Sequence, residues 1–199
     1  MTRPGLAPSA CYAWPVPTLK WSGRLWILLM LLSAGGVVAR DAAAQAAPSR
    51  AHVRGLLSGI EHVPTDADWR RLGDGALPVL IDLFNSPAEP AFVRLRALGA
   101  TGAFPRPAVR TFLLAAARVE HQHDLLVREA VVTLARAFGA AAVRDLLPFL
   151  SHPEVVVRDA TARSLGRIGG AQAIRALRAR LALEHDEGVR SSIEGALRR

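Results

Sequence analysis

The chain contains 199 residues, of which 51% are hydrophobic, with 25 Lys and Arg against 17 Asp and Glu and a single cysteine, Cys11. This length suits one domain and excludes a multi-domain enzyme, and a lone thiol excludes both a disulfide scaffold and a thiolate metal fold. The apolar fraction, rich in Ala and Leu, also excludes a disordered chain and favours a helical protein.

The first 46 residues carry the features of an export signal in the expected order. Lys20 and Arg24 precede an apolar run over 25–39, and the small residues Ala44 and Ala46 follow it. An apolar helix over 25–39 rises only about 22 Å, which is short of the roughly 30 Å hydrocarbon core of a bilayer. We therefore predict a cleaved signal peptide over 1–46 and an exported protein, with a membrane anchor at 25–39 as the alternative.

Residues 47–75 are predicted to form an N-terminal helical cap or linker. Thr65 with Asp68 three residues later resembles a capping box, which opens a short helix through Trp69. A preceding helix is indicated by apolar residues at helical spacing, namely Val53, Leu56, Leu57 and Ile60.

The remainder of the chain contains an internal repeat. Residues 127–139 (VREAVVTLARAFG) align with residues 157–169 (VRDATARSLGRIG) at Val-Arg, at the alanine two residues after the arginine and at a closing apolar-Gly pair. Weaker copies open at Val93 and Val189, so the spacings between copies are 34, 30 and 32 residues. Such a period corresponds to one helical hairpin per unit, and a unit of this size is stable only against its neighbours.

An apolar stripe at three- and four-residue spacing precedes each Val-Arg segment, as an amphipathic first helix requires. Its members are Leu77, Leu80, Ile81 and Phe84; Val109, Phe112, Leu113 and Ala116; Val143, Leu146, Leu147 and Leu150; and Ile174, Leu177 and Leu181. We expect Ser86 and Ser151 to cap second helices, and Gly139 and Gly169 to end them with positive φ. These features predict an all-α fold of about four stacked antiparallel hairpins over 76–199.

The pattern VRxAxxxxLGxIG at 157–169 resembles the second helix of a HEAT repeat, of the subtype shared with phycobilisome lyases. The resemblance covers roughly residues 76–199. It implies an α-solenoid whose second helices line the concave face and which holds another macromolecule. Lyases of that family attach bilin pigments, and a lyase-like enzyme subunit is therefore an alternative. Because the repeat alone does not carry this activity, no cofactor is predicted.

The resemblance also implies a structural role for the arginine that follows each valine. Such an arginine lies along the stack and pairs with acids of its own or the adjoining hairpin, and an exposed pair contributes about 0–1 kcal/mol. The four arginines are Arg94, Arg128, Arg158 and Arg190, and the expected acidic partners are Asp82, Glu129, Asp145 and Asp159. A basic ladder for an acidic ligand is the alternative.

Histidines and acids gather in equivalent loops between helices. They are Glu120, His121, His123, Asp124, His152, Glu154, Glu184, His185, Asp186 and Glu187. A metal ion needs several donors at about 2.0–2.2 Å from one point, whereas stacked helices lie about 8–10 Å apart. We therefore predict no metal site and a solvated edge whose acids favour the positive ends of the second helices, with metal binding or pH sensing as the alternative.

Common catalytic motifs are missing from the sequence. Residues 47–199 contain no cysteine nucleophile, no Gly-x-Ser-x-Gly elbow and no phosphate-binding glycine loop. They contain 21 basic and 16 acidic residues, but one Trp and no Tyr, which argues against a nucleic acid partner. We therefore predict no enzyme, no catalytic residues and no nucleic acid binding.

A helical wheel places a mixed row of charged and small residues opposite the buried stripe that begins at Val127. The row consists of Glu129, Val132, Thr133, Arg136, Asp159, Ala162 and Arg163. A surface of this kind suits a protein segment better than a polyanion. The sequence thus predicts an exported, non-catalytic scaffold that binds another protein through the face lined by its second helices.

Overall fold

The computed structural model of the chain describes residues 47–60, 62–119 and 122–198, which belong to one compact unit. Helices and short turns make up this part of the chain, and it contains no strand. The predicted signal peptide over 1–46 and the alternative anchor at 25–39 lie outside the described residues. Within the described ranges, no helix has both the length and the apolar character needed to cross a membrane.

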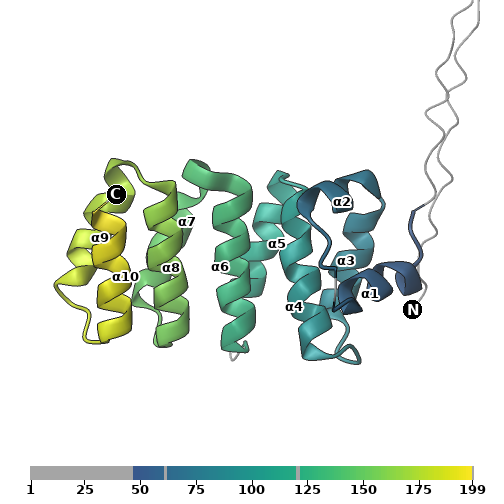
Figure 1. Ribbon diagram of the computed structural model, residues 1–199, viewed down its shortest axis with the longest axis horizontal. Coiled ribbons are helices and arrows are strands. Elements are labelled where there is room, and N and C mark those ends of the chain that lie inside the picture. The colour runs from purple at the N-terminus through teal and green to yellow at the C-terminus, as the bar shows by residue number, and fades with distance from the viewer. Residues whose placement is uncertain (1–46, 61, 120–121, 199) are drawn as a thin grey trace, which may run out of the picture. The chain divides into compact units, whose positions relative to one another are not determined.

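The described helices follow one another in pairs, as the labels in Figure 1 show. The first pair is α1 (Arg50–Ser58) and α2 (Asp66–Arg71). Four hairpins follow: α3 (Ala76–Asn85) with α4 (Ala91–Ala100); α5 (Pro107–Arg118) with α6 (Asp124–Phe138); a broken helix containing α7 (Val143–Leu146) with α8 (Val155–Ile168); and α9 (Gly170–Leu181) with α10 (Glu187–Leu197). The predicted all-α solenoid of about four hairpins behind an N-terminal cap is confirmed.

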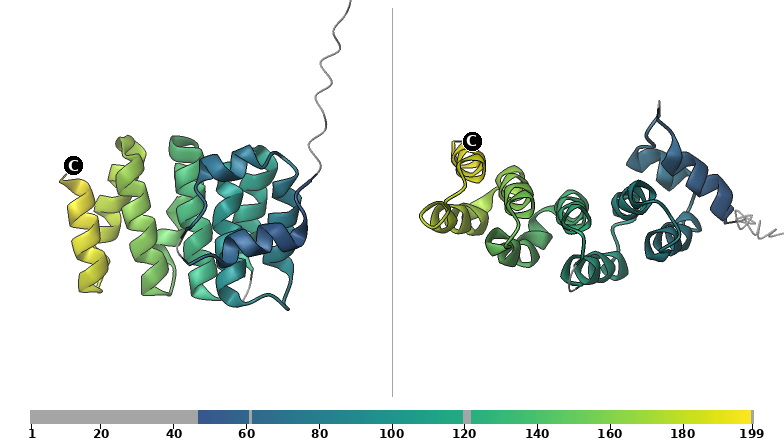
Figure 2. Two further views of the ribbon diagram at one scale, coloured as in Figure 1. Left: turned by 45° about the vertical axis from the view of Figure 1, so that its right-hand side comes forward. Right: turned by 90° about the horizontal axis from the view of Figure 1, so that it is seen from below.

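The hairpins stack in two rows, one of first helices and one of second helices (Figure 2). In the second row, α6 packs against α4 on one side and against α8 on the other, and α8 also packs against α10. Val127 and Val157, which open the two best copies, are 3% and 0% exposed. The prediction that these segments are copies of one hairpin with inward-facing valines is therefore confirmed.

Main-chain hydrogen bonds stay local throughout the described residues. Outside the helices, each of them joins residues no more than four positions apart. Neighbouring hairpins are therefore held together by side chains, and the apolar core that they share runs continuously from Val53 to Ala196. Glycine also lets neighbouring helices pack closely. A Cβ on Gly166 of α8 would lie 2.3 Å from the Cβ of Ala196 on α10.

Some of the predicted helix ends are confirmed and others are wrong. The capping box of Thr65 and Asp68 is confirmed, and Gly139 and Gly169 have φ of 50° and 71°. In contrast, α1 ends at Ser58, so Ile60 falls in the following loop and is 92% exposed.

The expected serine caps are wrong. Helix α4 begins after Pro90, and α8 begins after Glu154, and neither residue makes a side-chain capping bond. Ser86 and Ser151 instead lie at the ends of the preceding helical segments, because each loop contains extra residues before the second helix starts.

The first helix of the third hairpin is not a single α-helix. It runs through the 3₁₀ segment η2 (Gly139–Ala142), the four-residue α7 and the 3₁₀ segment η3 (Leu147–Ser151). Pro148 lies in η3, and proline has no N–H for an α-helical bond and its ring clashes with the carbonyl four residues earlier. The predicted apolar stripe still faces the core, because Val143, Leu146 and Leu150 are buried.

Candidate functional site

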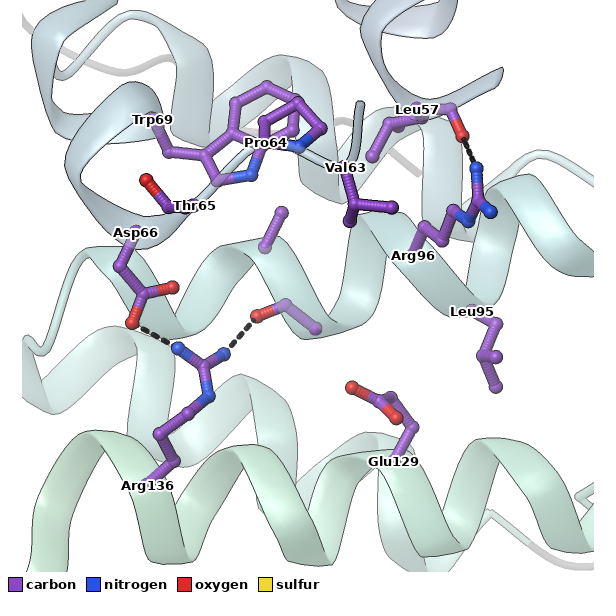
Figure 3. Close-up of a pocket in the computed structure, with 12 residues that line it drawn as sticks. Leu57, Val63, Pro64, Thr65, Asp66, Trp69, Leu95, Arg96, Glu129 and Arg136 are labelled. Atoms are coloured by element: carbon purple, nitrogen blue, oxygen red, sulfur yellow. Dashed lines mark hydrogen bonds and ion pairs between the residues drawn. The ribbon is translucent and has the colours of Figure 1, made fainter. Parts of the chain in front are cut away.

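The segment that precedes the first full hairpin, residues 57–60 and 62–69, lies on the face formed by the second helices (Figure 3). We refer to it as the N-terminal segment. Arg96 of α4 donates hydrogen bonds from Nη1 to the carbonyl oxygens of Leu57 and Gly59, both at 2.7 Å. The segment is thus held through its main chain. Its docking was not predicted from the sequence, because an arginine that binds carbonyl oxygens requires no particular residue in the segment it binds.

A second arginine fixes the same segment farther along the face. Arg136 of α6 pairs with the carboxylate of Asp66 at the start of α2, and its Nη2 donates to the carbonyl of Gly99 on α4 at 2.7 Å. Trp69 of α2 is buried nearby. Arg136 therefore joins three elements, α2, α4 and α6.

A pocket of about 260 Å³ lies between the N-terminal segment and helices α4 and α6. Its apolar walls include Leu57, Val63, Trp69 and Leu95. Glu129 of α6 also lines the pocket, and Figure 3 shows its carboxylate between Arg136 and Leu95.

Glu129 is a half-buried acid of this pocket. Burial raises the pKa of the Glu129 carboxyl, and the charge of Arg128, the hydrogen bond from Thr133 and the charge of Arg136 offset this effect only in part. The Thr133 hydroxyl donates to Oε1 over a long 3.4 Å. The predicted site residues Glu129 and Arg136 thus face the N-terminal segment of their own chain.

A larger hollow of about 460 Å³ lies between the C-terminal parts of α6 and α8. Val132, Ala135 and Ile168 provide apolar surface, and Arg136 and Arg167 provide two guanidinium groups. Arg167 is exposed and donates to the hydroxyl of Ser164 at 3.2 Å. Arg136 lines both this hollow and the smaller pocket, so the two sites adjoin.

Two residues of the predicted row are buried, so the prediction of an exposed row is wrong for them. Thr133 and Ala162 are both 0% exposed. Thr133 faces α4, because a Cβ on Gly102 just after that helix would lie 2.7 Å from its Cγ2. Ala162 lies between Asp159 and Gly166 on the flank of α8 that contacts α10. A second helix has neighbours on both sides, so its accessible strip is narrower than a simple wheel suggests.

The other members of the row on α8 remain accessible. Arg163 is exposed and pairs with Asp159 at 3.0 Å. Asp159 also accepts a hydrogen bond of 2.5 Å from the hydroxyl of Ser192 on α10. The binding of a partner by these residues stays a prediction.

Three of the four arginines that follow the repeat valines bind carbonyl oxygens of their own hairpins. Arg94 donates to the carbonyl of Phe84 at the end of α3, and Arg190 donates to the carbonyl of Leu181 at the end of α9. Arg158 binds the carbonyls of His152 and Pro153 just before α8. These bonds satisfy carbonyl oxygens that a helix end or a loop leaves without partners.

The acidic partners expected for the ladder are mostly wrong. Asp82 pairs with Arg50 of α1, Asp145 pairs with Arg110 of α5, and Asp159 pairs with Arg163. Arg128 contributes its charge to Glu129, as expected. The difference arises because Arg94, Arg158 and Arg190 each reach a main-chain carbonyl at a helix end or loop of their own hairpin.

Glu184 lies at the centre of a buried ionic cluster. Its side chain is 1% exposed and receives hydrogen bonds from Arg158 at 2.9 and 3.0 Å and from Arg180 at 2.7 and 3.0 Å. The main-chain amides of His185 and Asp186 also donate to it. The cluster therefore connects α8 with α9 and with the loop before α10.

The Glu184 carboxyl should make the folding stability of the protein depend on pH. Burial raises its pKa, but the hydrogen bonds from Arg158, the Asp186 amide and Arg180 outweigh burial and lower the pKa from 4.5 to about 2. The unfolded chain therefore takes up the proton first, so this stabilisation is present above about pH 4.5 and is lost as the pH falls toward 2. Chemical denaturation at several pH values should show that the free energy of unfolding falls by roughly 3 kcal/mol over this pH range. Glu184→Gln should remove this pH-dependent loss. An unchanged profile in this variant would contradict the prediction.

Several histidines and acids of the loop edge accept hydrogen bonds from main-chain amides near the starts of helices. The Nδ1 of His123 accepts from the amide of Leu125 and caps α6, and Asp186 caps α10 by accepting from the amide of Val189. The Nδ1 of His152 accepts from the amide of Glu154. Among the described residues, which exclude Glu120 and His121, no three metal-binding side chains come together.

Comparison with known families agrees with this architecture. Residues 113–198 match a family model described as HEAT repeats. This part of the chain consists of HEAT repeats. The matched HEAT repeats span part of α5 and all of α6 to α10. The phycobilisome-lyase subtype stays a prediction, and no match was found among curated proteins.

Proposed function

We propose that this protein is an exported, non-catalytic scaffold that binds another protein through its second-helix face. HEAT repeats commonly act as scaffolds for protein interactions, and solenoids use extended faces for binding. Export rests on the charged, apolar and small residues of segment 1–46.

One observation carries the proposal: the second-helix face already holds a polypeptide segment. Residues 57–60 and 62–69 of the chain itself lie on α4 and α6, bound by Arg96 through main-chain carbonyls and by Arg136 through a carboxylate. Farther along the second-helix face, α6 and α8 present Val132, Arg163 and Arg167 with no described segment over them. A partner segment bound there would extend the same mode of recognition.

The test is recovery of a partner from the envelope fraction with the tagged full chain. In the face variant, Arg163→Glu and Arg167→Glu reverse two exposed charges on the second helix α8. In the matched control, Arg175→Glu and Arg178→Glu reverse two exposed charges on the first helix α9. We expect the face variant to reduce recovery at least about tenfold, because like charges across an interface are costly. Equal recovery with both variants would contradict the proposed face.

A further inference from the structure

The hollow between α6 and α8 has the size and composition of a binding site for one large apolar side chain. Its volume of about 460 Å³ falls within the range of pockets that bind ligands. Val132 and Ala135 line it from α6 and Ile168 lines it from α8, so its surface is mainly apolar. The hydroxyl of Ser164, which also lines it, is already bonded to Arg167.

The charges around this hollow are positive. Arg136 and Arg167 both line it, and none of the residues that line it is an acid. Arg136 already has a carboxylate partner, Asp66, whereas the described partner of Arg167 is the neutral Ser164. A guanidinium group binds a carboxylate with strong, directional hydrogen bonds, so Arg167 favours a partner that brings an acid.

The neighbouring pocket shows how this face binds such a segment. There the chain's own Trp69 is buried, and Asp66, three residues before it, pairs with Arg136 (Figure 3). An apolar residue and a nearby carboxylate are thus seated side by side against α4 and α6. The hollow between α6 and α8 offers the same combination, an apolar surface beside a guanidinium group, one hairpin farther along.

We propose that this hollow binds an acidic and apolar segment of the partner protein. A large apolar side chain packs against Val132 and Ile168, and a carboxylate close to it in sequence pairs with Arg167. This inference rests on the proposed function and adds the chemistry of the partner to it.

A defined peptide tests the inference without the natural partner. The probe is a short fluorescent peptide with Leu-Phe at its centre and two Glu on each side, and its binding to the purified full chain is measured by fluorescence anisotropy. One control peptide replaces every Glu with Gln, and the other replaces Leu-Phe with Ser-Ser. We expect the probe to bind at least about tenfold more tightly than either control, because the site requires both the charge and the apolar side chain.

Two protein variants assign the binding to the hollow. Arg167→Glu should weaken binding of the probe at least about tenfold, because it replaces attraction by repulsion. Arg178→Glu makes the same change of net charge on α9 and should leave binding unchanged. Both side chains are exposed, so both variants should fold.

Several results would overturn the inference. These are no binding of the probe, equal binding of the Gln or the Ser-Ser peptide, and equal loss of binding in Arg167→Glu and Arg178→Glu. If partner recovery from the envelope still depends on Arg163 and Arg167 in that event, the proposed function stands and only the acidic and apolar partner is rejected. If recovery is also independent of these arginines, the proposed face fails as well.

Discussion

Glu184→Ala is expected to lower the free energy of unfolding by about 3–5 kcal/mol, the usual cost of removing one partner from a buried ionic cluster. The carboxylate is enclosed together with Arg158 and Arg180, whose side chains are only 12% and 17% exposed. Without Glu184, both guanidinium groups stay largely buried and lose their anion. The amides of His185 and Asp186 also lose their acceptor.

Urea denaturation of the full chain, monitored by circular dichroism, measures this effect. Glu194→Ala is the matched control, because Glu194 is an exposed glutamate on the adjacent helix α10. We expect the control to change the unfolding free energy by no more than about 0.5 kcal/mol. A similar small change in Glu184→Ala would mean that the cluster does not stabilise the fold.

Leu165→Ala is expected to cost about 2–5 kcal/mol, because the substitution removes buried methyl groups and leaves a cavity that the surrounding helices fill only in part. Leu165 is fully buried in the shared core, on a helix that packs against α6 on one side and α10 on the other. The cavity therefore forms where hairpins meet, and it should weaken the whole C-terminal part of the stack.

The same denaturation assay tests this prediction. Val155→Ala on the same helix is the control, since Val155 is 42% exposed and should cost less than about 1 kcal/mol. A loss of only a few tenths of a kcal/mol in Leu165→Ala would contradict the helix register on which the buried positions were assigned.

The stacked hairpins could be predicted from the sequence because their signals are periodic. The repeated Val-Arg segments and the apolar stripes report burial directly, and Val127, Val157 and Leu165 are buried as expected. Gly139 and Gly169 end second helices because they adopt positive φ, which other residues rarely do.

Features that depend on single, non-periodic contacts could not be predicted. The docking of the N-terminal segment depends on Arg96 and its bonds to main-chain carbonyls, which any sequence supplies. Burial of Thr133 and Ala162 depends on how closely α4 and α10 approach, which glycines such as Gly102 and Gly166 permit. Arg167 was missed because it lies outside the row chosen from the wheel.

A weak signal for Glu184 was present. Glu184 lies five residues before Val189, and the same position before Val157 and Val127 carries His152 and Gln122. A polar residue therefore recurs there. That only the last of them forms a buried ionic cluster depends on the two arginines that the fold brings to it, Arg158 and Arg180.

The confinement of main-chain hydrogen bonds to single hairpins makes the stack elastic. A β-sheet that flexes must distort its ladder of hydrogen bonds, whereas one hairpin here can tilt on the next while every described main-chain bond stays intact. Only side chains such as Asp159 and Ser192 have to readjust. The spacing between successive second helices can therefore adapt to the width of whatever lies across them.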